Sequence, residues 1–300
     1  MSGIFFRFGI RHNLTFALPR TGVVLNSMND LVTKNKDGRF DILAVHALTK
    51  ELFDRLLNDD VIQLAVVRHP LKRMISAAYF YRDLALKNHR TNYLNKVPQK
   101  DFIHNLINKP ELYEDNANFT LTRNAMGKRF GFSPSTQKND TGAIKKQLDS
   151  LNKEFNLVLV TERLDESLVL MKRTLNWTFN DILYVSKNVH SHERVNISET
   201  EEEKYRDASF LDYAIYDYFT DILDRKITSE GAGFIDEVTC FKNILLKVSR
   251  FCERKSSSRL TIEKSKWNTP FQLWRDDCRL MSNGNPQIIA NLRNKIKRRK

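Results

Sequence analysis

The sequence predicts an α/β fold with a parallel sheet flanked by helices, and two strand–helix pairs support this prediction. In the first pair, the apolar run 61–67 is followed at Pro70 by an amphipathic segment that reaches Arg82. In the second pair, the apolar run 155–160 precedes the amphipathic segment 164–177. Neither run alternates with polar residues, which is typical of strands in a parallel sheet covered on both faces.

The remaining elements follow from periodicity along the chain. Residues 4–14 and 51–57 are predicted helices, and residues 40–45 form a candidate strand that ends at His46. Residues 88–152 are polar and predict loops with short helices. After a charged insert, residues 210–223 predict a helix whose aromatic residues, at helical spacing, favour core packing over a ligand site; they are Tyr213, Tyr216 and Phe219.

The chain has 300 residues and a formal net charge of +13, but the positive charge is concentrated at one end. Residues 1–240 contain 33 Lys and Arg against 32 Asp and Glu, whereas residues 241–300 contain 16 against 4. We therefore expect a main domain over 1–240 and a basic, helical C-terminal subregion over 241–300 that packs on it. A basic end of this kind is usually a solvated terminus, so the charge does not by itself indicate nucleic-acid binding.

Cysteines and asparagines bear on the cellular compartment. Cys240, Cys252 and Cys278 form no C-x-x-C motif, so a zinc site is not expected. One disulfide with a free thiol, or three buried thiols, are both compatible with this spacing. Five N-x-S/T sequons occur where about three would arise by chance, which hints at secretory passage. His190 and His192 are expected at the surface of a polar loop.

The turn between the strand 61–67 and the following helix predicts an anion site. A helix that begins at the carboxyl edge of a parallel strand points unpaired N–H groups and its positive dipole end at the loop. Arg68 leaves the strand end with a guanidinium suited to bidentate phosphate binding. Ser76 lies two turns along the helix, from where its hydroxyl can donate to the same anion. A purely structural arginine at a strand end is the alternative interpretation.

The segment from Val66 to Tyr81 resembles the 3′-phosphate-binding segment of Golgi carbohydrate sulfotransferases. Residues 155–175 (FNLVLVTERLDESLVLMKRTL) and their continuation to Tyr184 are similar to the galactose-3-O-sulfotransferase family, to which galactosylceramide sulfotransferases belong. The similarity also includes residues 4–19 and 123–132, and a short stretch near residues 278–281.

This resemblance implies a sulfotransferase fold related to P-loop kinases and transfer of a sulfuryl group from 3′-phosphoadenylyl sulfate (PAPS) to the 3-hydroxyl of a β-galactosyl residue. Arg68 and Ser76 would bind the 3′-phosphate, and His69 stands where many relatives have Asp. His46 is the candidate general base, because a neutral histidine near pH 7 can accept the hydroxyl proton. A histidine that only packs the sheet edge remains open. Glu162 is a candidate acceptor-site carboxylate, and no metal is expected.

The family also implies a type II protein of the Golgi lumen and membrane, with a galactosyl glycolipid or glycan as acceptor and no nucleic-acid partner. The acceptor loops are expected within residues 88–150. The chain begins a few residues before the helix that follows the family's 5′-phosphosulfate loop, so an N-terminally truncated fold without that loop or a membrane anchor is expected. The alternatives are a non-catalytic paralogue that binds nucleotide or glycan, and a basic anion- or nucleic-acid-binding α/β protein.

Overall fold

The computed structural model describes residues 1–33, 38–47, 50–89, 92–114, 118–186, 195–254 and 257–298. These residues form two compact units that interleave along the chain. Unit 1 consists of residues 1–62, 168–187 and 232–300, and unit 2 consists of residues 63–167 and 188–231. The expected boundary at residue 240 falls within a helix of unit 1, α11 (Gly233–Glu253). His190 and His192 lie outside the described residues.

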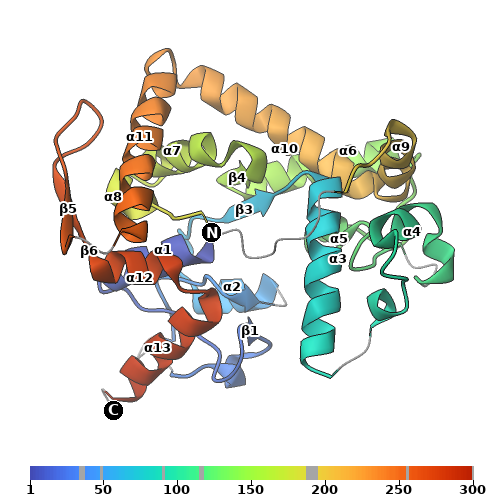
Figure 1. The fold of residues 1–300 in the computed structure, drawn as a ribbon, viewed down its shortest axis with the longest axis horizontal. Coiled ribbons are helices and arrows are strands. Elements are labelled where there is room, and N and C mark those ends of the chain that lie inside the picture. Colours follow the sequence, from blue (N-terminus) through green and yellow to red (C-terminus); the bar gives the residue numbers. More distant parts are fainter. Residues whose placement is uncertain are drawn as a thin grey trace. The chain divides into compact units, whose positions relative to one another are not determined.

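Unit 2 contains a pair of parallel strands and the helices that pack on it (Figure 1). Its elements are β3 (Leu64–Val67), α3 (Pro70–Lys87), η2 (Tyr93–Asn95), α4 (Phe102–Asn108), η3 (Pro110–Leu112), α5 (Ala125–Arg129), α6 (Thr141–Glu154), β4 (Leu157–Val160), η4 (Thr161–Arg163), α9 (Glu199–Ala208) and α10 (Phe210–Ser229). The helix α7 (Leu164–Thr174) begins in unit 2 and ends in unit 1.

The first predicted strand–helix pair is present as β3 and α3. Pro70 occupies the first turn of α3, where its missing N–H leaves no hydrogen bond unmade. Inside unit 2, α3 buries Leu71, Met74 and Ala78 in a core cluster that also includes residues of α4, α9 and α10. This cluster fixes the helix, and therefore also the turn that precedes it.

The expectation that β3 is a central strand covered on both faces is wrong for the described residues. Val66 is 40% exposed, and β4 is the strand partner that β3 has in the described part of the chain. All four residues of β4 are buried instead, because α10 packs on this strand. A continuous apolar run shows that a strand is half or fully buried, but not how many strands pair with it.

The charged insert after residue 197 is the helix α9, which begins with a capping box. The hydroxyl of Ser198 accepts the N–H of Glu201, and the Glu201 carboxylate accepts the N–H of Ser198. The Glu201 carboxylate also receives hydrogen bonds at 2.7 Å from His104 and Asn108. Although partial burial opposes the shift, these hydrogen bonds lower the pKa of Glu201 to about 2. They join α9 to α4.

Unit 1 contains two short β pairs and the helices around them. Its elements are α1 (Ser2–Arg11), β1 (Val24–Leu25), η1 (Met28–Asp30), β2 (His46–Ala47), α2 (Lys50–Leu56), α8 (Phe179–Ile182), α11, β5 (Arg259–Ile262), β6 (Phe271–Trp274), α12 (Arg275–Ser282) and α13 (Asn285–Lys297). The strand predicted over residues 40–45 is reduced to a bridge between Ile42 and Phe16, and regular pairing begins at His46, opposite Val24.

The basic C-terminal segment is not a free terminus up to residue 297. The helix α13 buries Ile288, Ile289 and Leu292 in a core cluster with Phe6 and Phe16. The apolar face of α13 therefore holds it against α1. We expected a basic helical subregion that packs on the main domain, but composition did not identify the face that packs, because the charge of a segment does not reveal an apolar stripe on one side of it.

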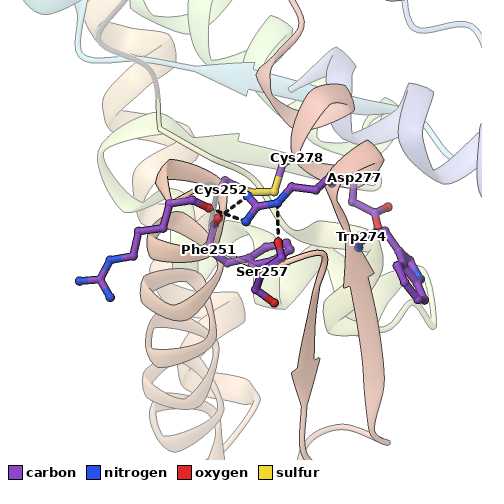
Figure 2. Close-up of a disulfide and its surroundings, with 8 residues drawn as sticks. Phe251, Cys252, Ser257, Trp274, Asp277 and Cys278 are labelled. Atoms are coloured by element: carbon purple, nitrogen blue, oxygen red, sulfur yellow. Dashed lines mark hydrogen bonds between the residues drawn. A yellow bond between two sulfur atoms is a disulfide. The ribbon is translucent and has the colours of Figure 1, made fainter.

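A disulfide between Cys252 and Cys278 joins the C-terminal end of α11 to α12 within unit 1 (Figure 2). The guanidinium of Arg275 reinforces this junction, since it donates to the carbonyl oxygens of Phe251 and Ser257 at 2.7 Å. It also lies 4.2 Å from the centre of the Phe251 ring. Cys240 is a half-buried free thiol, so one disulfide with one free cysteine is the arrangement observed.

Candidate functional site

The register of the two parallel strands places both strand ends at one edge of the sheet. Val67 lies opposite Val160, so the turns that follow β3 and β4 are neighbours. The hydroxyl of Thr161 donates to the carbonyl of Val67 at 2.9 Å, which ties the turns together. The candidate site is built on these two turns and on the first turns of α3.

Glu162 contacts the turn after β3 directly. Its carboxylate accepts the backbone N–H of His69 at 3.1 Å, at the N-cap position of α3. A carboxylate at a helix N-terminus is favourable, because it meets unpaired N–H groups and the positive end of the dipole. Glu162 was predicted to contact an acceptor. In the structure its carboxylate contacts the turn that carries Arg68.

The ring of His69 is enclosed by residues of α9 and α10. Its centre lies 5.7 Å from the ring of Tyr213 and 5.3 Å from that of Tyr216, both edge-on. Nε2 is 3.8 Å from the carboxylate of Glu202, and the buried Nδ1 has no hydrogen-bond partner among the described residues. Burial lowers the pKa of His69, although the charges of Glu202 and Glu162 oppose this shift. The imidazole is therefore neutral near pH 7.

The two residues predicted to bind phosphate retain free polar groups. Arg68 and Ser76 are both half-buried, and neither side chain is hydrogen-bonded or ion-paired to another residue that the structure describes. The guanidinium before the helix N-terminus and the hydroxyl two turns along the helix can each bind an anion without first breaking a bond to a described residue.

A buried charge pair underlies this segment of α3. Arg73 donates to the carbonyl of Leu121 at 3.3 Å, and its Nε lies 3.6 Å from the Asp212 carboxylate. Asp212 is fully buried and accepts the N–H of Gly127 at 2.9 Å. Burial raises the pKa of Asp212, while Arg73 and the backbone N–H groups of α5 oppose the rise. The pair anchors α3 to α5 and α10 one turn before Ser76.

Tyr213, Tyr216, Glu202 and Thr161 adjoin the site and were not predicted to do so. The spacing of the aromatic residues indicated a buried face of α10, and Phe219 is indeed 1% exposed. Tyr216, however, contacts His69. Burial raises the pKa of Tyr216, and the negative charge of Glu162 raises it further. Periodicity identifies the face of a helix, but not the distant residue that this face meets.

His46 belongs to unit 1, whereas Arg68, Ser76 and Glu162 belong to unit 2. The imidazole of His46 is exposed at the start of β2, and its backbone N–H donates to Val23 at 3.2 Å. Its exposure differs from that expected of a histidine packed into a sheet edge. No group of three His, Cys, Asp or Glu side chains with metal-binding geometry occurs among the residues described.

The fold defines a class of protein, an α/β protein in which the parallel strand β3 leads through a short turn into the helix α3. A sequence model of galactose-3-O-sulfotransferase matches residues 1–276, and the chain belongs to this family. It is 27% identical over 237 residues to human galactose-3-O-sulfotransferase 2. The aligned region covers 76% of this chain and 57% of that protein.

Two further relatives come from Mus musculus. Galactose-3-O-sulfotransferase 3 is 26% identical over 250 residues, which is 79% of this chain and 56% of that protein. Galactosylceramide sulfotransferase is 26% identical over 245 residues, 76% of this chain and 54% of that protein. The chain therefore aligns with little more than half of each of these relatives. No solved structure matches it.

Proposed function

We propose that this protein transfers the sulfuryl group of PAPS to the 3-hydroxyl of a β-galactosyl residue. The observation that carries the proposal is that Arg68, two residues before α3, and Ser76, two turns into it, have polar groups that no described residue pairs with. The family supplies the identity of the anion, which is the 3′-phosphate of the nucleotide. The geometry of the turn supplies the means to bind it.

In this proposal, the residues that bind and surround the nucleotide have separate roles. Arg68 binds two phosphate oxygens through its planar guanidinium, and Ser76 donates one hydrogen bond from the helix. Glu162 is the proposed acceptor-site carboxylate. It positions the turn by accepting the His69 N–H, and the contact between Thr161 and Val67 holds the two strand ends in register.

Transfer requires in-line attack by the acceptor oxygen on the sulfur atom. The bond between sulfur and the bridging phosphate oxygen breaks, and adenosine 3′,5′-bisphosphate leaves. His46, whose imidazole is exposed, accepts the proton of the 3-hydroxyl as general base. The proposed reaction uses no metal, because the leaving nucleotide is already a stabilised anion.

The acceptor is a galactosyl glycolipid or the galactose of a glycan, bound by loops within residues 88–150. The Golgi lumen is the proposed compartment, by family membership and by the disulfide, which persists in oxidising compartments. No helix among the described residues is long and apolar enough to cross a membrane.

Transfer of ³⁵S from labelled PAPS to a β-galactoside tests the proposal. A 3-O-methyl galactoside is the matched control, since it lacks only the attacked hydroxyl. We expect label on the first acceptor and none on the second. His46→Ala is expected to lower turnover by about 10²-fold or more while donor affinity stays unchanged. Equal labelling of both acceptors would exclude the 3-hydroxyl, and full turnover of the variant would exclude His46 as base.

A further inference from the structure

Five sequons remain unexplained by the proposed reaction, and the structure separates them by the surroundings of their asparagines. The asparagines are Asn13, Asn118, Asn139, Asn176 and Asn196. A glycan attached to a folded protein needs an asparagine amide that is exposed to solvent and makes no native hydrogen bond. An asparagine that is required by the backbone or by its own hydrogen bonds has another reason to be present.

Asn118 is required by its hydrogen bonds. Its side-chain amide donates to the carbonyls of Pro134 at 2.6 Å and of Thr136 at 3.1 Å. The hydroxyl of its sequon partner Thr120 donates to the Glu114 carboxylate at 3.0 Å. A sugar on the Asn118 amide nitrogen would remove at least one of these hydrogen bonds, so a glycan at this position would disturb the contacts that Asn118 makes in the fold.

Asn13 and Asn176 are explained by the backbone. Asn13 has φ of 54° after α1, and Asn176 has φ of 52° after α7. Asparagine tolerates this left-handed region better than other residues with a side chain, apart from aspartate. Their presence in sequons is therefore no evidence of modification.

Asn139 has neither of these roles. It lies in the turn before α6, in which the N–H of Asp140 donates to Gln137 at 3.1 Å. Its φ is not positive, and a turn of this kind accepts most residue types. The side chain is exposed and makes no hydrogen bond to a residue in the described ranges. Thr141, which completes the sequon, is exposed as well.

Asn196 is directed outward by the alternation of an extended segment. Its neighbours Val195 and Ile197 both pack against the core cluster of unit 2. Successive side chains of an extended backbone point to opposite faces, so the side chain of Asn196 points to solvent. It is exposed, its φ is not positive, and no described residue hydrogen-bonds its amide. Ser198, the N-cap of α9, completes this sequon.

We propose that Asn139 and Asn196 are N-glycosylation sites, and that Asn118 is not glycosylated in the folded protein. The donor is a lipid-pyrophosphate-linked oligosaccharide of the secretory lumen. A bond forms between the side-chain amide nitrogen and C1 of the first sugar, the bond from C1 to the pyrophosphate oxygen breaks, and the amide loses one proton. This inference rests on the proposed lumenal localisation, but not on sulfotransferase activity.

Peptide mapping of the 300-residue chain, expressed behind a secretion signal in eukaryotic cells, tests the proposal. Enzymatic release of N-linked glycans converts the modified asparagine to aspartate, which marks the site by mass. We expect aspartate at positions 139 and 196 and asparagine at position 118. Unmodified asparagine at 139 or 196, or aspartate at 118 in folded monomer, contradicts the assignment at that position.

Variants keep the test independent of secretion. In chain imported into microsomes, Asn139→Gln and Asn196→Gln should each remove one glycan-dependent mobility step. Thr141→Val should remove the same step as Asn139→Gln, whereas Thr141→Ser, which preserves the sequon, should retain it. Titration of the same purified chain with adenosine 3′,5′-bisphosphate separates the two proposals. If the chain binds the nucleotide but carries no glycans, only the glycosylation proposal is overturned. If it carries glycans but does not bind the nucleotide, only the proposed sulfotransferase function is overturned.

Discussion

Replacing Arg68 by alanine should weaken the binding of adenosine 3′,5′-bisphosphate and leave the stability of the protein nearly unchanged. A charge-assisted hydrogen bond contributes about 1.5–3 kcal/mol, so the expected loss of affinity is about 10- to 150-fold. Because the side chain is half-buried and no described residue pairs with it, its removal leaves no buried group unsatisfied. The change in the free energy of unfolding should therefore stay within about 0.5 kcal/mol.

Calorimetric titration measures the affinity, and urea unfolding measures the stability. Arg225→Ala is the matched control, because it makes the same change in charge at an exposed residue that pairs with Asp221 within α10. It should retain the affinity of the unmodified chain. Undiminished affinity in Arg68→Ala would refute the site. A large loss of stability would refute the argument that Arg68 has no structural partner.

Three further perturbations test the structural part of the account. Asp212→Ala should lower the free energy of unfolding by about 1–3 kcal/mol, since it leaves the buried N–H of Gly127 without its acceptor, and an unchanged urea midpoint would contradict this. Replacing Cys252 and Cys278 together by serine opens a cross-link that spans 26 residues and should cost about 3.5 kcal/mol in the same assay. The pKa of Glu201 is lowered from 4.5 to about 2, so its contribution to stability is present above pH 4.5 and lost as the pH falls toward 2. Glu201→Gln should flatten that part of the stability profile, and an identical profile would disprove the assigned hydrogen bonds.

The local part of the site could be predicted from the sequence. Two signals in neighbouring residues predicted it: the apolar run that ends at Val67, and Pro70 as the first residue of a helix. The structure has this order of strand, turn and helix. The partner strand β4 was also found, because its run of buried residues is equally clear.

The long-range part of the site could not be predicted. The contact of Glu162 with the His69 N–H joins residues 93 positions apart, and it depends on the register of two strands. The enclosure of His69 by Tyr213 and Tyr216 depends on how α10 packs, and periodicity reveals only the buried face of that helix. The apolar face of α13 was hidden in a segment dominated by basic residues.

Comparative titration of the 300-residue chain with adenosine 3′,5′-bisphosphate and with adenosine 5′-monophosphate tests the central claim most directly. The two nucleotides differ only in the 3′-phosphate that Arg68 and Ser76 are proposed to bind. We predict binding of the bisphosphate in the micromolar range and an affinity at least about tenfold lower for the monophosphate. Equal affinity for both nucleotides, or no binding of either by a folded chain, would contradict the account.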